Sequence, residues 1–240
     1  MKNILIPTNL HQDTTVALKT AVKTANGKQC EVVFLLLSEV PDSYSSSYLL
    51  RRMNYQMSKS QLDVLEHCRE IIASNNNCTL KIHNQYGISS PLLRNLLEHL
   101  NIGLTIFIPS YKSSSKKLHN YCMQLLLNCK CPILHTGTNT VQQDFNKALY
   151  IETTKSGLQA EDLQQMVQDQ LSFNVVSQAK FFEAQQPEEI TPLLNEAISK
   201  NNIDLLIETR TPEKIKSWKK EKPHLNDLGL PVLSLYEEVN

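Results

Sequence analysis

Lysine and serine side chains are concentrated in one short loop near the middle of the chain. The run Lys112-Ser-Ser-Ser-Lys-Lys117 follows the apolar stretch Leu104–Ile108 and precedes a helical pattern near Lys116–Asn128. Ammonium and hydroxyl groups at the start of a helix are chemically able to hold an anion, because the helix dipole favours negative charge there. A solvated loop in which a serine caps the helix is the alternative interpretation of the same residues.

Other candidates for chemistry are few. His11 and His119 are both expected near the carboxyl edge of the predicted sheet, but no nucleophile or acid stands at a recognisable spacing, so no catalytic residues are assigned. Cys129-Lys-Cys131 is the only close cysteine pair, and no second Cys or His pair completes a metal site. We expect no metal and reduced, structural thiols at all six cysteines, because unpaired cysteines behave as small buried hydrophobes. A redox or metal role is the alternative interpretation, and no other feature of the sequence supports it.

Apolar runs alternate with helical spacings along the first half of the chain, which predicts βαβ crossovers and a mostly parallel, doubly wound sheet. The first helix is expected to be capped by Asp13 or Thr14, and a leucine stripe is expected on the core face of the third. The predicted strands are Asn3–Thr8, Glu31–Leu37, Thr79–Asn84 (an edge strand), Leu104–Ile108 and Pro132–Thr136. The helical patterns follow Asp13, span Ser58–Ser74, begin at Ser90 with Leu92, Leu93, Leu96, Leu97 and Leu100 on the apolar face, and lie near Lys116–Asn128.

An internal repeat divides the sequence. Pro91–Phe107 aligns without gaps on Pro192–Glu208, with seven of the 17 positions identical. Residues 137–146 form a polar linker, so we predict domains at residues 1–140 and 141–240, the second shortened by about one strand–helix unit. The strands predicted for the second copy are Ala148–Glu152, part of Phe173–Phe182, Leu205–Thr209 and Val232–Leu235.

Charge and hydropathy exclude some classes of function. The formal net charge is zero, with 14 Lys/Arg against 8 Asp/Glu in residues 1–140 and 10 against 16 in residues 141–240. A neutral chain does not predict a nucleic-acid partner, and no apolar run approaches the ~20 residues that a membrane span needs. We therefore expect no nucleic acid and no membrane as partners, and a cytoplasmic location.

Three segments resemble the universal stress protein family in a tandem arrangement. They are KNILIPTNLHQDTTVALKTAVKTA (Lys2–Ala25), GISSPLLRNLLEHLNIGLTIFIPS (Gly87–Ser110) and CPILHT (Cys131–Thr136). The resemblance covers residues 1–137 and, more faintly, 146–236. It implies an α/β fold with flavodoxin-like (Rossmann-like) parallel sheets in two tandem domains, the second truncated. In nucleotide-binding members of the family, ATP lies at the carboxyl ends of the strands.

The family's phosphate-binding glycines are missing here. Its Gly-x-x-Gly falls on Pro109 and Lys112, and proline has no N–H to offer a phosphate. The later Gly-Ser falls near Cys122-Met123 or Asn120-Tyr121, and the adenine-side Asp is Asn9. We therefore expect no cofactor. If ATP or AMP binding persists, the resemblance assigns it to Pro7, Asn9, Pro109, Ser110, Lys112, Ser113, Ser114, Ser115 and Asn120.

The sequence thus favours a non-enzymatic, universal-stress-like protein that acts in the stress response through association with an unidentified protein partner. The two copies are expected to form an intramolecular pseudo-dimer in which Pro132–Thr136 and Pro231–Tyr236 run antiparallel, and a homo-oligomer is an additional possibility. The alternative is a regulatory protein that binds ATP or AMP with the Lys112–Lys117 loop. A small hydrolase is a third hypothesis, with no nucleophile motif in its favour.

Overall fold

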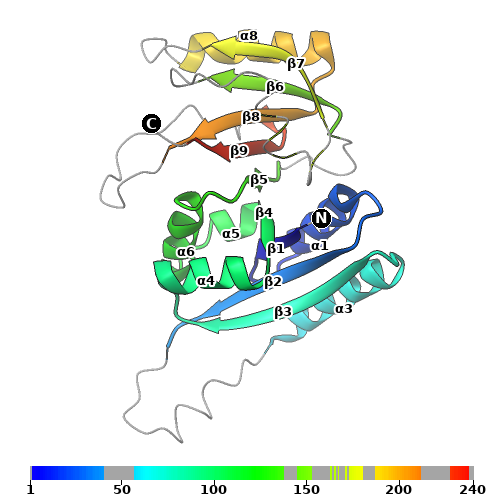
Figure 1. Ribbon diagram of the computed structural model, residues 1–240, viewed down its shortest axis with the longest axis vertical. Coiled ribbons are helices and arrows are strands. Elements are labelled where there is room, and N and C mark those ends of the chain that lie inside the picture. The colour runs from blue at the N-terminus through cyan, green and yellow to red at the C-terminus, as the bar shows by residue number, and fades with distance from the viewer. Residues whose placement is uncertain are drawn as a thin grey trace, which may run out of the picture. The chain divides into compact units, whose positions relative to one another are not determined.

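The computed structural model divides the chain into two compact units, Met1–Leu127 and Asn128–Asn240 (Figure 1). It describes residues 2–40, 57–137, 145–152, 163, 165, 167, 171, 173–180, 187–211 and 228–237. Most of the predicted linker, residues 137–146, lies outside the described residues.

The first unit contains a parallel sheet in the order β3-β2-β1-β4. Its strands are β1 (Asn3–Pro7), β2 (Cys30–Ser38), β3 (Cys78–Tyr86) and β4 (Ile102–Phe107). Strands β1, β2 and β4 are buried almost throughout, as continuous apolar runs predict for a sheet covered on both faces. Strand β3 is only half-buried and pairs with β2 alone among the described strands, which confirms the predicted edge position.

Helices cover both faces of this sheet (Figure 1). They are α1 (Asp13–Ala25), α3 (Lys59–Ala73), α4 (Ser90–His99), α5 (Pro109–Lys112) and α6 (Lys117–Leu127). Helices α1 and α3 pack on each other, and α4 packs on α6, so each pair forms one layer. The predicted α/β class with doubly wound parallel strands is confirmed. The short helix α5, which follows β4 directly, is not predicted by the sequence pattern.

Two details of the predicted helices are wrong. Helix α1 begins at Asp13 itself, and its N-cap residue, Gln12, makes no side-chain capping bond. The Asp13 carboxylate instead accepts hydrogen bonds from Ser110. In α4 the core residues are Leu93, Leu96 and Leu97, whereas Leu92 is 39% exposed. The buried face of the helix therefore does not include all of its leucines.

The second unit contains strands in the order β5-β9-β8-β6-β7. These are β5 (Ile133–His135), β6 (Lys147–Glu152), β7 (Asn174–Lys180), β8 (Leu205–Arg210) and β9 (Val232–Tyr236), with helix α8 (Pro187–Asn201). The pairs β6–β7, β6–β8 and β8–β9 are parallel. Strand β5 pairs antiparallel with β9, with Leu134 opposite Leu233. The expected antiparallel arrangement of these two segments is therefore observed, while the pseudo-dimer of the two copies stays a prediction.

Parallel pairing follows the same pattern in the two units. Strand β1 lies between β2 and β4, as β6 lies between β7 and β8. Among the described strands, β3 has no counterpart beyond β7, in line with the shortened second copy that the sequence predicts. The common order is what a repeat would produce, and the tandem duplication itself remains a prediction.

The described core of the second unit lies between α8 and the sheet. Leu194 of α8 packs with Leu149, Leu206 and Val232 from three neighbouring strands. A close approach of the backbone accompanies β5 and β9, because a Cβ atom at Gly137 would lie 2.4 Å from the carbonyl oxygen of Gly229. None of the helices within the described ranges has the length and apolar character that a bilayer crossing requires.

Candidate functional site

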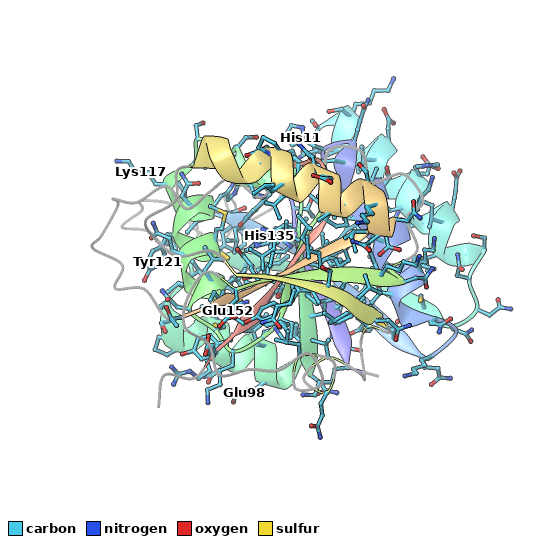
Figure 2. All side chains as sticks on the ribbon, turned by 90° about the horizontal axis from the view of Figure 1, so that it is seen from above. His11, Glu98, Lys117, Tyr121, His135 and Glu152 are labelled. Carbon is cyan, nitrogen blue, oxygen red and sulfur yellow. The ribbon has the colours of Figure 1, made fainter. Side chains whose placement is uncertain are left out.

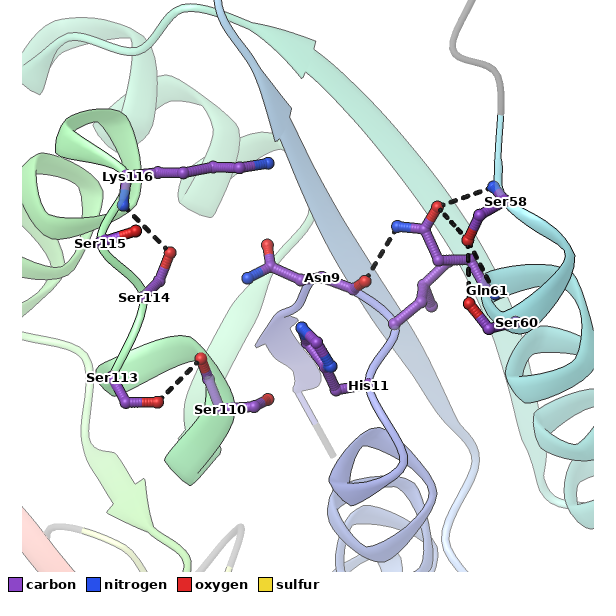
Figure 3. A pocket seen from close by; sticks show the side chains of 11 residues that line it. Asn9, His11, Ser58, Ser60, Gln61, Ser110, Ser113, Ser114, Ser115 and Lys116 are labelled. Atoms are coloured by element: carbon purple, nitrogen blue, oxygen red, sulfur yellow. Dashed lines mark hydrogen bonds between the residues drawn. The ribbon is translucent and has the colours of Figure 1, made fainter.

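A polar hollow of ≈ 560 Å³ opens at the carboxyl ends of the strands in the first unit (Figure 3). Its walls come from the loop after β1, the segment between β4 and α6, and the first turn of α3. Parallel α/β sheets bind ligands at such a point, where the connections from neighbouring strands diverge to opposite faces. The lining residues are Asn9, Leu10, His11, Ser58, Ser60, Gln61, Ser110, Ser113, Ser114, Ser115 and Lys116.

Backbone donors after β4 are occupied by the chain itself. The N–H groups of Tyr111 and Lys112 both donate to the Ile108 carbonyl, at 3.2 and 3.1 Å. The N–H of Ser113 donates to the Pro109 carbonyl, and the N–H of Ser114 donates to the Tyr111 carbonyl. This bonding is possible because Pro109 begins the helical turn α5, where its fixed φ and missing N–H are tolerated. A turn of this kind does not present a row of outward N–H groups to a phosphate.

The Asp13 carboxylate accepts hydrogen bonds from Ser110. The Ser110 N–H donates to one carboxylate oxygen at 2.8 Å, and the Ser110 hydroxyl donates to the other at 2.7 Å. Asp13 is the first residue of α1, so its negative charge also interacts favourably with the helix dipole. The carboxylate therefore stands where an external anion would meet the first donors after β4.

His119 packs against the segment between β4 and α6. It is 1% exposed, its ring stacks on Tyr111 with 4.9 Å between centroids, and its Nδ1 lies 2.9 Å from the Ser114 hydroxyl. Burial lowers the pKa of His119, the Lys116 ammonium lowers it further, and a hydrogen bond with the Leu37 backbone opposes both effects. Since the Ser114 hydroxyl also accepts from the Lys116 N–H at 3.3 Å, Ser114 helps to fix the local structure before α6.

The start of α3 forms the wall of the hollow that faces the segment between β4 and α6. Ser58 and Gln61 form a capping box, in which each side chain bonds to the backbone of the other. The Gln61 amide also donates to the Asn9 carbonyl at 3.0 Å, which links α3 to the loop after β1 (Figure 3). In that loop Leu10 has a positive φ of 58°, and its N–H donates to the Thr8 hydroxyl at 2.9 Å. A left-handed leucine costs roughly 1 kcal/mol, so the surrounding hydrogen bonds must hold it.

The predicted lysine cluster does not converge on the hollow. Lys116 extends toward it, and Asn9, in the loop after β1, points into the same space (Figure 3). Lys112 is half-buried and is not part of the lining, and Lys117 projects outward from α6 (Figure 2). Among the residues that the structure describes, Lys116 is therefore the only lysine or arginine that lines this hollow.

Of the residues assigned by resemblance, Asn9, Ser110, Ser113, Ser114 and Ser115 line the hollow. Pro7, Pro109, Lys112 and Asn120 do not: Pro7 is buried in β1, and Asn120 is half-buried in α6. Sequence reasoning missed the contribution of α3, although the spacing Ser58-x-x-Gln61 signals a helix start. Within the described ranges, no cluster of three or more His, Cys, Asp or Glu side chains is arranged to hold a metal ion.

Comparison with known proteins places this fold. No protein-family model matches the chain, and no curated protein does. A universal stress protein from Archaeoglobus fulgidus DSM 4304 matches with a TM-score of 0.57 and 12% identity, over 98% of each chain. A protein of unknown function from Pseudomonas aeruginosa PAO1 matches with a TM-score of 0.55 and 13% identity, over 98% of this chain and 92% of that one. The chain thus has the fold of universal stress proteins, as its sequence resemblance predicts.

Proposed function

We propose that this chain is a non-enzymatic protein of the universal-stress type that acts in the stress response through protein association and does not bind ATP. The observation that carries the proposal is the occupied backbone after β4. Ser110, Ser113 and Ser114 all direct their N–H groups to acceptors within the chain. A phosphate would have to displace these acceptors before it met the donors that bind phosphates in such loops.

Electrostatics supports the same conclusion. A nucleotide phosphate near Ser110 would lie close to the Asp13 carboxylate, which is bonded to that residue. Two like unit charges about 4 Å apart repel by roughly 4 kcal/mol at the effective dielectric constant near a protein surface. Within the described part of the chain, Lys116 is the only cationic side chain of the lining that would offset this repulsion.

Association of the two units within one chain is part of the proposal. The excess of basic residues in residues 1–140 and of acidic residues in residues 141–240 favours attraction between them. Small domains bury a smaller fraction of their surface than large ones, so association of the two units would add to the stability of the full chain. We expect the full chain to melt in one transition by calorimetry, and two well-separated transitions would contradict the intramolecular pseudo-dimer.

The absence of ATP binding is tested by thermal unfolding with and without Mg-ATP. We expect no change in melting temperature for the natural chain, whereas a ligand at 100 times its Kd would add about 2.7 kcal/mol. The Asp13→Asn variant removes the internal negative charge, and Glu98→Gln, an exposed position on α4, is the matched control. A saturable rise in the natural chain would overturn the proposal.

The second candidate function is nucleotide binding through the Lys112–Lys117 loop, with ATP or AMP as ligand. The observation in its favour is the hollow itself, whose ≈ 560 Å³ falls in the range of small-molecule sites and whose walls carry six serines. This candidate requires that Lys116→Ala abolish a rise in melting temperature, while Lys117→Ala, outside the lining, leaves it intact.

A further inference from the structure

The six cysteines fall into two groups by their environment. Four are buried in the first unit: Cys30, Cys68, Cys78 and Cys122. Burial raises the pKa of Cys30 and of Cys68 to about 11, and it also raises the pKa of Cys78. Thiols of this kind are unreactive, because the thiolate is the nucleophile. Cys129 and Cys131, in the second unit, are half-buried and thus accessible in part.

Arg210 lies against both of these cysteines. It ends β8, is 5% exposed, and donates through one terminal nitrogen to the carbonyl oxygens of Cys129, at 2.9 Å, and Cys131, at 2.5 Å. Its other terminal nitrogen donates to the Ser234 carbonyl of β9. The guanidinium carbon lies 6.0 Å from the centre of the Tyr236 ring. A delocalised positive charge is therefore fixed against the backbone of two cysteines whose side chains are half-buried. The Cys131 thiol itself donates to the Pro132 carbonyl, with 3.5 Å between the sulfur and the oxygen.

The electrostatic coupling runs in both directions. Burial lowers the pKa of Arg210 to about 10, and negative charge on Cys131, on Glu208 and on Cys129 acts in the opposite direction. The guanidinium still carries its proton at neutral pH, and a nearby positive charge favours the charged form of an acidic group. Lys130, between the two cysteines, is exposed and adds a second positive charge nearby.

We infer that Cys129 and Cys131 form a peroxide-reactive dithiol, held in an electropositive environment by Arg210. Reactive cysteines occur in partly exposed, electropositive surroundings, which distinguishes this pair from the four buried thiols. The substrate class is a hydroperoxide, including hydrogen peroxide. This inference concerns the second unit and is independent of whether the hollow in the first unit binds a nucleotide.

The proposed reaction oxidises the dithiol and reduces the hydroperoxide. One thiolate attacks the outer peroxide oxygen, so that an S–O bond forms, the O–O bond breaks, and the departing oxygen takes up a proton. The second thiol then attacks the sulfenic sulfur, an S–S bond forms, and the hydroxyl leaves with a proton as water. Overall the two thiols lose two electrons and two protons, and the hydroperoxide becomes an alcohol and water.

The first test follows the six thiols in the full-length, reduced chain. Hydrogen peroxide is added, the remaining thiols are blocked with N-ethylmaleimide, and peptides are identified by mass spectrometry. We expect Cys129 and Cys131 to be lost together as an intrachain disulfide while the four buried cysteines stay alkylatable after unfolding. The single variants Cys129→Ser and Cys131→Ser should stop at a sulfenic acid that dimedone traps, whereas the control Cys78→Ala should oxidise as the natural chain does.

A pair of substitutions isolates the role of the positive charge. Arg210→Met and Arg210→Lys both lose the planar fork that binds the carbonyls, but only Arg210→Met loses the charge. We expect oxidation of the dithiol to be about tenfold slower in Arg210→Met than in Arg210→Lys, the effect of about one pKa unit on the thiolate population. Circular dichroism establishes that both variants are folded before their rates are compared.

If either variant fails to fold, the pH profile of the natural chain decides the question. The alkylation rate of Cys129 and Cys131 should reach its midpoint at lower pH in the folded chain than in the chain unfolded by urea. Equal midpoints, oxidation of the buried cysteines before this pair, or disulfides only between chains would each overturn the inference.

Discussion

Strands β4 and β8 hold the same place in the parallel order of their units, yet their carboxyl ends are satisfied by opposite charges. After β4, the Asp13 carboxylate accepts from the N–H and hydroxyl of Ser110. At the end of β8, the Arg210 guanidinium donates to the carbonyls of Cys129, Cys131 and Ser234. The first unit supplies an internal anion to backbone donors, and the second supplies an internal cation to backbone acceptors.

This difference shows two ways in which a sheet edge that commonly binds ligands can be filled by the chain's own groups. In the first unit the filling is incomplete, because a hollow lined by hydroxyl and amide groups remains beside Asp13. In the second unit Arg210 is 5% exposed, and its carbonyl acceptors surround the charge. We therefore expect a small ligand to compete with the internal charged group only in the first unit. The internal charged group of the second unit should contribute more to stability than that of the first.

The largest effect is expected from a charge placed inside β4, on which the first half of the comparison depends. Ile106 is fully buried, so Ile106→Asp should leave the chain unfolded, since an unpaired buried charge costs several kcal/mol against a total stability of ~5–15 kcal/mol. Urea unfolding followed by circular dichroism measures this. The control Leu62→Asp, on an exposed position of α3, should melt as the natural chain does, and a cooperatively folded Ile106→Asp would refute the strand assignment.

The next largest effect concerns Arg210. Arg210→Met leaves three carbonyl oxygens in the second unit without this donor, which should lower the free energy of unfolding by roughly 2–5 kcal/mol. Arg94→Met, at an exposed position of α4, serves as the control and should change stability by no more than about 0.5 kcal/mol. Equal urea midpoints for the two variants would show that the internal cation does not stabilise its unit.

A smaller effect is expected for the internal anion. Asp13→Asn keeps an acceptor but loses the charge, and should lower the free energy of unfolding by about 1–2 kcal/mol. Combined with Ser110→Ala in a double-mutant cycle, it should show a coupling of at least about 0.5 kcal/mol, because the two residues bond directly. Asp63→Asn, an exposed residue of α3, is the matched control. Strict additivity of Asp13→Asn and Ser110→Ala would contradict the bond.

The smallest predicted effect is a pH dependence from His119. Because its pKa is lowered in the folded chain, the unfolded chain binds the proton more tightly. The contribution to stability is full above about pH 6.5, the usual value for the unfolded state, and is lost as the pH falls through the lowered folded value. Urea midpoints should thus fall less steeply with acid in His119→Gln than in the natural chain.

Much of the fold is predictable because apolar periodicity reports burial directly. Ile106 and Ile133 are both fully buried, as their continuous apolar runs indicate. The failure at Leu92 has a local cause: helical spacing shows that a residue is near the apolar face but does not fix how wide the covered part of that face is. Helix α5 is one turn long and has no period from which it could be recognised.

The site is less predictable because its decisive contacts join distant parts of the chain. Asp13 and Ser110 are separated by 97 positions, and Arg210 lies 81 positions from Cys129. The sheet rule brings the loops after β1 and β4 to one edge, but it does not determine which side chain bonds to which backbone group. The loss of the glycines is visible in the sequence, whereas the residue that satisfies the remaining donors appears only in the structure.

The amide resonances of Ser110 to Ser114 provide the most direct test of whether the N–H groups after β4 are bonded to acceptors within the chain. Two-dimensional ¹⁵N–¹H NMR spectra of the full chain would be recorded during a titration with Mg-ATP, and again for Asp13→Asn. We predict that Mg-ATP leaves these five amides of the natural chain unmoved, whereas Asp13→Asn shifts the Ser110 amide because its acceptor has changed. A saturable movement of these amides on addition of Mg-ATP to the natural chain would contradict the proposal and favour nucleotide binding.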